Sequence, residues 1–308
     1  MAQMLSRAVV LTAAPGSRAI DEATIAAMRE ALVGETVIAE TWLAPAEAWE
    51  CLIVRPDGDT CVPLRGRLWQ LVAARPIDVN IVPDDLALRR KKLLIADMDS
   101  TMIEQECIDE MADVMGLKPR IAAITERAMR GELDFEAALT ERLALLAGIE
   151  AAKLEWVWRE RIVLMPGGLT LVGTMKRNRA FTALVSGGFT FFTARVAAAV
   201  GFDVHRANTL GIEDGRTTGR VVGPILGREA KLAALQEFAA ARGLHSAETL
   251  AVGDGANDLA MIRAAGLGVA YRAKPVVAAE AHAAVTHGDL TALLYLQGYR
   301  REDFADAA

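Results

Sequence analysis

Hydrophobic and polar residues follow two different patterns along this chain, and the change occurs near residue 90. Before that point, short strand-like runs alternate with stretches whose apolar residues recur at helical spacing. We predict strands at 7–13, 35–43, 48–54 and 77–82, and helices at 21–32 and 64–74. Asp21 stands where it can cap the first helix. The order is that of a split βαβ, ferredoxin-like (βαββαβ) unit, which we assign to residues 1–85.

Beyond residue 90, four apolar runs lack polar alternation. They lie at 92–97, 181–188, 249–255 and 266–271. Such runs are typical of parallel strands that are buried on both faces. Helical stretches between them fit the crossover connections of a parallel sheet. We therefore predict an α/β domain over residues 86–308.

Two segments interrupt this second pattern. Several amphipathic helical stretches between Asp99 and about Met165 predict a helical cap at about 103–163, inserted after the first strand. The stretch 203–221 has two extended runs around Asp214 and Gly215, which indicates a hairpin. The cap is in a position to cover one edge of the sheet.

Composition narrows the class of protein. With 308 residues, 53% of them hydrophobic, the chain can bury one large core or two unequal ones. The formal net charge is -6 and no long basic run occurs, so a nucleic-acid partner is not expected. Three widely spaced cysteines form neither a disulfide framework nor a metal pattern, which suits a reducing compartment. Without an apolar run near 18 residues or a signal peptide, we expect a cytoplasmic protein with no membrane partner.

Polar or glycine residues end the first three apolar runs. They are Asp97 and Asp99 in the first, Ser186 and Gly187 in the second, and Asp254, Asn257 and Asp258 in the third. Ligands of open parallel sheets bind at the carboxyl ends of the strands, so we expect these residues to share one site. Positions i and i+2 of a strand point to the same side, which would direct Asp97 and Asp99 together.

Clustered carboxylates repel one another unless a cation, a proton or a reaction makes the arrangement favourable. Oxygen ligands of this kind are what Mg²⁺ prefers, and no histidine or cysteine cluster argues for zinc. A bare carboxylate is also a nucleophile for phosphoryl transfer, and a second acid can move the protons. Lys231, a serine hydroxyl and backbone N–H groups are suited to holding phosphate oxygens.

Four stretches carry a resemblance to a known family. DMDST, SGGF, the later Lys231 and GDGANDLAM, in this order, resemble the motifs of the haloacid dehalogenase (HAD) superfamily of phosphotransferases. Within it, residues from about Lys91 to Phe304 are most similar to the phosphoserine phosphatases, and residues 1–85 loosely resemble the ACT-like domain often joined to them. The resemblance implies a Rossmann-like core with a helical cap and Mg²⁺ as cofactor. It also implies hydrolysis of O-phospho-L-serine through an aspartyl-phosphate, as the last step of serine biosynthesis.

The resemblance also implies a role for each matching residue. Asp97 would be the nucleophile and a metal ligand, Asp99 the general acid/base and a ligand through its backbone carbonyl, Asp254 a further ligand and Asp258 a support of the metal site. The substrate would be bound by Ser186, Gly187 and Lys231 at the phosphoryl group, by Asn257, by Glu106 at the ammonium and by Arg142 at the carboxylate. Met98 stands where phenylalanine is common in the motif.

Other interpretations stay open at this point. The two acids of DMDST could be turn residues, Glu106 could only stabilise a helix start, and Arg142 could extend from an apolar stripe to solvent. The enzyme could act on another small phosphomonoester or transfer the phosphoryl group to an alcohol. An amino-acid-sensing protein with an inactive HAD domain would lack a nucleophile or a ligand, and none is missing. The sequence leaves open whether the chain forms a homodimer.

Overall fold

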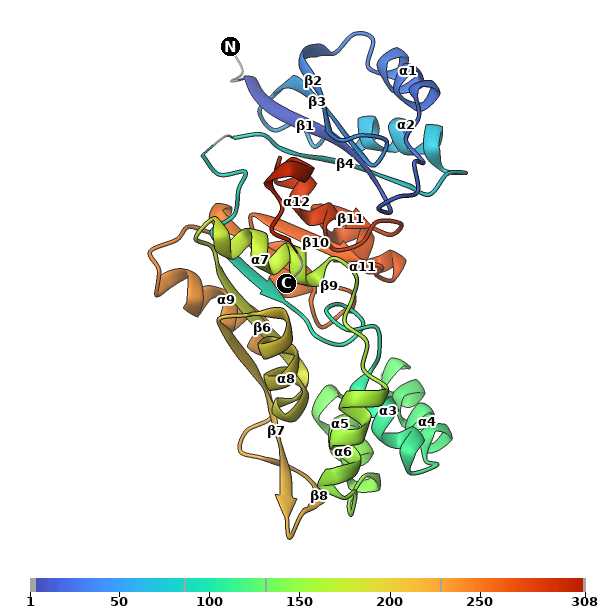
Figure 1. The fold of residues 1–308 in the computed structure, drawn as a ribbon, viewed down its shortest axis with the longest axis vertical. Coiled ribbons are helices and arrows are strands. Elements are labelled where there is room, and N and C mark those ends of the chain that lie inside the picture. The colour runs from blue at the N-terminus through green and yellow to red at the C-terminus, as the bar shows by residue number, and fades with distance from the viewer. Residues whose placement is uncertain (1–3, 86, 131, 228, 307–308) are drawn as a thin grey trace.

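The computed structural model describes residues 4–85, 87–130, 132–227 and 229–306. Their strands form two separate sheets, one of four strands and one of seven. Figure 1 shows the four-stranded sheet at one end of the molecule, the seven-stranded sheet in the middle and a group of helices at the other end. The sheet that carries the candidate residues therefore lies between two further units.

The first sheet has the predicted ferredoxin-like order. Its elements are β1 (Met4–Ala13), α1 (Glu22–Ala31), β2 (Thr36–Ala44), β3 (Ala48–Pro56), α2 (Val62–Val72) and β4 (Ile77–Pro83). The strands lie in the order β2-β3-β1-β4 and pair antiparallel. Asp21 caps α1 as predicted, because its carboxylate accepts a hydrogen bond of 2.8 Å from the Thr24 N–H.

The second sheet has the strand order β11-β10-β9-β5-β6-β7-β8. These strands are β5 (Leu93–Ala96), β6 (Phe181–Phe189), β7 (Val204–Glu213), β8 (Arg216–Val222), β9 (Thr249–Gly253), β10 (Leu267–Tyr271) and β11 (Ala283–Val285). All neighbours pair parallel except β7 and β8. Every residue of β5, β9 and β10 is buried, which explains their continuous apolar runs. The sequence pattern does not predict β11, because three residues are too few to show a period.

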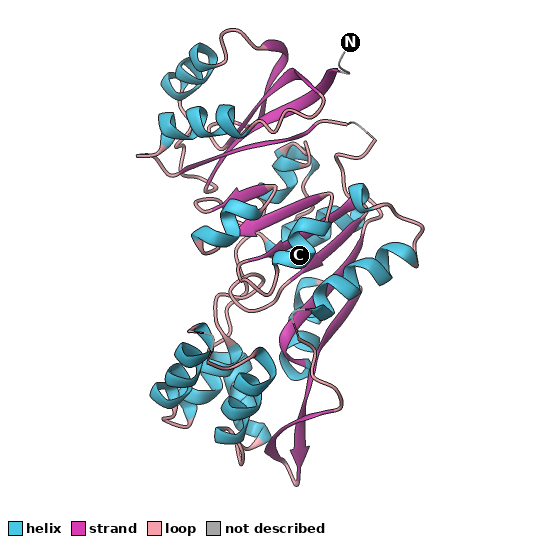
Figure 2. Ribbon diagram, turned by 180° about the vertical axis from the view of Figure 1, so that it is seen from behind, coloured by secondary structure: helices cyan, strands magenta, loops and turns pink. Residues whose placement is uncertain are grey.

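Helices cover the seven-stranded sheet (Figure 2). They are α7 (Gly168–Arg177), α8 (Thr190–Val200), α9 (Glu229–Ala240), α10 (Leu259–Ala264), α11 (Pro275–Glu280) and α12 (Ala292–Leu296). Successive residues of β5 point to opposite faces. Leu94 accordingly belongs to a core cluster with residues of α7 and α8, and Ile95 to another cluster with residues of α9. The expected α/β architecture is confirmed.

The predicted cap consists of α3 (Cys107–Val114), α4 (Lys118–Met129), α5 (Phe135–Leu145) and α6 (Ala151–Glu160). The chain enters and leaves the cap through two paired stretches, which we call the neck (102–104 and 163–165). In the neck, the Glu104 N–H donates to the Val163 carbonyl at 3.0 Å and the Met165 N–H to the Met102 carbonyl at 2.9 Å. The cap is thus joined to the core by a short hydrogen-bonded ribbon.

The predicted hairpin is formed by β7 and β8, which turn at Asp214 and Gly215 with positive φ at both residues. It runs along the cap (Figure 1). The Thr217 hydroxyl accepts a hydrogen bond from the Ile149 N–H at 2.9 Å and donates one to the Leu146 carbonyl at 2.6 Å. The hairpin therefore gives the cap a second attachment to the core.

Side chains of β4 and of the segment that follows it join the two sheets. Asn80 exchanges hydrogen bonds of 2.8 and 2.9 Å with the backbone of Ala284 in β11. The Asp78 carboxylate accepts from the N–H groups of residues 286–288 at 2.9 to 3.0 Å. These bonds fix the first unit on the edge of the second sheet.

The cysteines Cys51, Cys61 and Cys107 are all buried and free. Among the described residues, no helix combines the length and the apolar character needed to cross a membrane. Desolvation raises the pKa of all three thiols.

Candidate active site

Asp97 and Asp99 follow β5 at the end of the parallel strands. Because β5 ends at Ala96, both acids lie in the loop beyond it, and the strand alternation expected from the sequence does not orient them. The backbone holds Asp97 instead. Its N–H donates to the Val252 carbonyl of β9 at 3.0 Å, and its Oδ1 accepts from the Met98 N–H at 2.8 Å. Asp97 is only 5% exposed, so its carboxylate is removed from bulk water.

Lys231, near the start of α9, connects two of the predicted acids. Its Nζ lies 2.7 Å from Asp97 Oδ1 and 2.6 Å from Asp258 Oδ1. Burial alone would lower the pKa of Lys231, but the two carboxylates more than offset this and raise it. The lysine is therefore a permanent positive charge in the middle of the site.

Three carboxylates gather around this single lysine. Oxygen atoms of Asp97, Asp254 and Asp258 lie within 4.8 Å of one another. Burial and the charge of Asp97 raise the pKa of Asp254, and the same causes raise that of Asp258 to about 7. Both oxygens of Asp258 already accept hydrogen bonds, one from Lys231 and one from the Gly255 N–H at 3.0 Å. The remaining acceptors are an oxygen-only set of the kind that suits Mg²⁺.

Asp99 lies beside the start of the cap. Its Oδ1 accepts a hydrogen bond of 3.1 Å from the Cys107 N–H at the first position of α3. Burial, followed by the charges of Glu106 and Asp97, raises the pKa of Asp99 to about 8. A carboxyl group in these surroundings can hold a proton at neutral pH, as a general acid must.

The cap adds one acidic and one basic residue to this edge. Glu106 keeps access to solvent and accepts a hydrogen bond of 2.7 Å from the Ser100 hydroxyl, and desolvation raises its pKa. Arg142, half-buried on α5, donates to the Ala138 carbonyl of its own helix, at 3.2 Å. Within the described part of the chain, its guanidinium forms no ion pair. Burial lowers the pKa of Arg142. The nearby charges of Asp109, Glu106 and Asp99 act in the opposite direction but do not fully offset it.

The SGG stretch lies at the irregular end of β6, where its pairing with β7 shifts register. The Ser186 hydroxyl accepts a hydrogen bond of 2.9 Å from the Gly188 N–H. A Cβ atom on Gly188 would lie 2.9 Å from Asp99 Oδ2, so glycine permits the close approach of that carboxylate. A Cβ on Gly187 would lie 3.1 Å from the ring of Phe135 on α5. The turn is therefore enclosed between Asp99 and the cap.

Asn208 of β7 is a site-supporting residue that the sequence interpretation missed. Its side chain is 1% exposed and donates to the Gly187 carbonyl at 2.8 Å, while its oxygen accepts from the Leu226 N–H at 2.7 Å. It thus ties the SGG turn to the segment that leads into α9 and Lys231. The sequence signal that could have indicated Asn208 is an amide side chain within a strand whose neighbours Ala207 and Leu210 are apolar, and both are buried in the structure.

Asn257 completes the set of predicted residues. It is half-buried, and its Oδ1 would lie 2.2 Å from a Cβ on Gly255, so it packs over the turn that follows β9. The structure therefore gathers all the predicted residues at one edge of the sheet, with Asp97, Lys231 and Asp258 in direct contact. The role of each residue stays a prediction.

A family model described as haloacid dehalogenase-like hydrolase matches residues 94–263. The match covers more than half of the chain and includes both Asp97 and Asp254. The chain belongs to this family. In this hydrolase, the motifs that contain Asp97, Ser186 and Asp254 lie at the carboxyl ends of β5, β6 and β9, as the sequence predicts.

The hydrolase is also similar to curated and solved proteins. It is 47% identical over 241 residues to a phosphoserine phosphatase of Streptomyces coelicolor, with 78% of this chain and 58% of that protein covered. It is 46% identical over 223 residues to a phosphoserine phosphatase of Polaromonas sp., with 71% and 94% covered. The crystal structure of a HAD family hydrolase from Salmonella enterica serovar Typhi has a TM-score of 0.82 and 32% identity, covering 94% of this chain and 98% of that one. The chain thus spans less than two thirds of the Streptomyces relative and nearly all of the Polaromonas one.

Proposed function

We propose that the protein hydrolyses O-phospho-L-serine to L-serine and phosphate, as the last step of serine biosynthesis. The observation that carries this proposal is the presence of one acidic and one basic side chain of the cap, Glu106 and Arg142, within electrostatic reach of Asp99. Phosphoserine has an ammonium and a carboxylate near its phosphate, and these two side chains are complementary to them. The similarity to two proteins named phosphoserine phosphatase supports the same substrate.

The residues support a reaction in two steps. Asp97 attacks phosphorus, forming an aspartyl-phosphate and breaking the bond to the serine oxygen, which takes a proton from Asp99. Asp99 then accepts a proton from water, and the hydroxide cleaves the aspartyl-phosphate to release phosphate and free Asp97. Lys231, the Ser186 hydroxyl and the N–H groups of the SGG turn bind the phosphoryl oxygens.

Mg²⁺ fits the carboxylate set. Asp97, Asp254 and the backbone carbonyl of Asp99 would hold the ion, and Asp258 would support the site while it anchors Lys231. When bound, Mg²⁺ neutralises the clustered carboxylates and the charge of the phosphoryl group. Among the described residues, Lys231 is the one cation paired with any of these three acids.

The substrate assignment is tested with unaltered protein and the variant Arg142→Ala. For the unaltered protein, kcat/KM for O-phosphoserine should exceed that for O-phosphothreonine, phosphoethanolamine and an aryl phosphate by orders of magnitude. Arg142→Ala should lower kcat/KM for phosphoserine by about 10- to 100-fold, because a charge-assisted pair is lost. Phosphoethanolamine lacks a carboxylate and should be much less affected. Phosphate release measures each rate.

Arg120→Ala is the matched control, because Arg120 is an exposed arginine on the neighbouring helix α4. It should leave all four rates unchanged. Equal losses for phosphoserine and phosphoethanolamine in Arg142→Ala would mean that Arg142 only stabilises the cap. Similar kcat/KM values of the unaltered protein for all four esters would still agree with a phosphatase, but they would contradict phosphoserine as the specific substrate.

The supporting role of Asn208 gives a separate prediction. Asn208→Leu leaves the Gly187 carbonyl and the Leu226 N–H without partners, which costs about 1–3 kcal/mol for each buried group. The SGG turn should lose its fixed position. We expect weaker competitive inhibition by inorganic phosphate and a fall in kcat/KM of at least about tenfold. Asn178→Leu, at the exposed residue that caps the C-terminus of α7, is the control, and an equal effect of both variants would rule out a specific role.

A further inference from the structure

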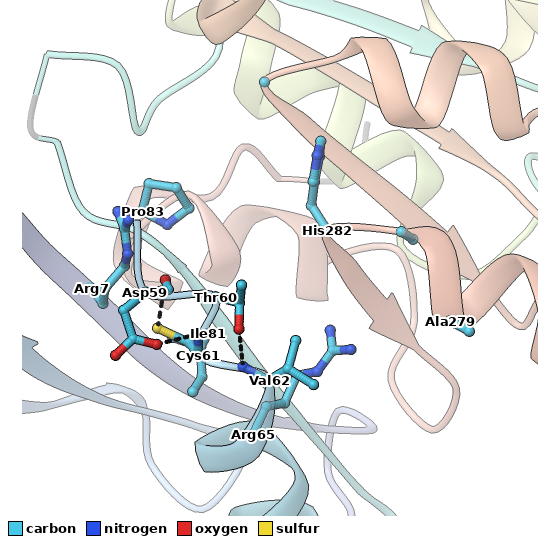
Figure 3. A pocket seen from close by; sticks show the side chains of 12 residues that line it. Arg7, Asp59, Thr60, Cys61, Val62, Arg65, Ile81, Pro83, Ala279 and His282 are labelled. Carbon is cyan, nitrogen blue, oxygen red and sulfur yellow. Dashed lines mark hydrogen bonds between the residues drawn. The ribbon is translucent and has the colours of Figure 1, made fainter. Parts of the chain in front are cut away.

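A cavity of about 370 Å³ lies between the N-terminal unit and the hydrolase core (Figure 3). None of the candidate active-site residues lines it. One wall comes from the N-terminal unit, with Arg7 of β1 and residues 59–62 and 65 at the start of α2. The other wall comes from the core, with Gly266, Ala281 and His282. The bonds of Asn80 described above hold the two walls together.

Three other charged groups at this junction form ion pairs or several hydrogen bonds within the protein. Arg89, which is 8% exposed, forms ion pairs with Asp84 and Glu50. The Asp78 carboxylate accepts three backbone hydrogen bonds. The Lys91 ammonium donates to two backbone carbonyls, at 2.6 and 2.7 Å. This is the usual arrangement, because an uncompensated charge between two packed surfaces is costly.

The charges of Arg7 and Arg65 are less fully compensated, and the Arg7 side chain acts on Asp59 and Cys61 without a direct ion pair. Both arginines are half-buried and line the cavity, and neither guanidinium forms an ion pair with a described residue. Asp59 also lines the cavity, but its carboxylate is already paired with Arg55 and accepts a hydrogen bond from the Cys61 N–H at 2.9 Å. The cavity therefore carries an excess of positive charge.

His282 adds a neutral donor to the core wall. Its Nδ1 accepts a hydrogen bond of 2.9 Å from the Gly268 N–H, which leaves the proton of the neutral ring on Nε2. Burial and the charge of Lys91 lower the pKa of His282, so the ring is neutral at pH 7. The Thr60 hydroxyl lies on the opposite wall, and Figure 3 shows these side chains coming from both units.

We propose that this cavity is a second ligand site, which binds a small organic anion with one or two carboxylate or phosphate groups. Arg7 and Arg65 would provide the charge-assisted hydrogen bonds, and His282 and Thr60 further donors. The volume is that of a small-metabolite pocket. Because both units supply donors, the ligand would bind only when the units are docked.

Isothermal titration calorimetry of the full chain tests the proposal, with malonate and citrate as carboxylate probes and inorganic phosphate as the phosphate probe. At least one probe should bind with a stoichiometry of one at this site. Arg65→Gln and Arg7→Gln should each weaken that binding at least about tenfold. The probe that binds most tightly distinguishes a carboxylate ligand from a phosphate ligand.

Arg67→Gln is the matched control, because Arg67 is exposed on the same helix and does not line the cavity. Phosphate can also occupy the catalytic site, so its competitive inhibition of turnover is measured in the same variants and should not change. Absence of binding by every probe up to about 10 mM would overturn the proposal. Equal binding by Arg65→Gln, Arg7→Gln and Arg67→Gln would overturn it as well.

Discussion

Replacing Asp97 by asparagine should lower kcat by at least about 10³-fold while the protein stays folded. An amide has no anionic oxygen to attack phosphorus, so the aspartyl-phosphate cannot form. The fold should tolerate the change, because Lys231 keeps its ion pair with Asp258 and one of three mutually repelling carboxylates is removed. Phosphate release from phosphoserine gives the rate, and thermal unfolding monitored by circular dichroism gives the stability.

Asp113→Asn is the control for this experiment. Asp113 is an exposed acid on α3 that pairs with Arg161 at the surface, away from the carboxylate cluster. Its variant should retain the full rate. Turnover by Asp97→Asn near the unaltered rate would exclude Asp97 as the nucleophile and would direct the search to another acid of the cluster.

Removing divalent cations with a chelator should stop turnover, and adding Mg²⁺ back should restore it. We expect a loss of at least about 100-fold. Among the described residues, Lys231 is the one cation paired with any of Asp97, Asp254 and Asp258, and these acids repel both one another and an incoming phosphate. Rates measured before chelation, after it and after readdition give the size and the reversibility of the effect.

A binding measurement separates the metal site from the chemistry. Titration of chelated protein with Mg²⁺ should give one binding event, and Asp254→Asn should weaken it, since the Asp254 carboxylate forms no ion pair with a described residue and its contact with the Thr101 hydroxyl is long, at 3.4 Å. Potassium chloride at matched ionic strength should not restore activity. Full turnover in the presence of chelator would refute the carboxylate–Mg²⁺ account.

Much of the fold could be predicted from the local pattern. Buried parallel strands are apolar on both faces, so β5, β9 and β10 stand out as continuous runs, and Asp21 indicates the start of α1. The three residues of β11 could not be found in this way, because three positions are too few to show a period. β11 is placed by its parallel pairing with β10 and by a hydrogen bond from its Ala284 N–H to the Asn80 side chain of the other sheet. That bond joins residues 204 positions apart and leaves no local signature.

The residues that form the site could be predicted from the sequence, but the contacts among them could not. Motif order brings Asp97 and Lys231 to the same edge, yet nothing in the sequence indicates that Lys231 pairs with Asp97 and Asp258 at once. The strand alternation does not apply to Asp97 and Asp99, because β5 ends one residue before the first of them, although the two carboxylates lie close enough to influence one another. Asn208 escaped notice because a single amide in a strand resembles any other polar residue until its partners are known.

The two attachments of the cap limit how it can move. The neck joins the cap at one end through paired backbone stretches, and the hairpin holds it again through Thr217. A cap attached only through the neck could rotate widely, whereas a cap also bound to the hairpin can move only as far as the hairpin bends. If the cap moves relative to the core, the hairpin would have to move with it as one body. The displacement of Arg142 would then depend on the bending of β7 and β8 as much as on the neck.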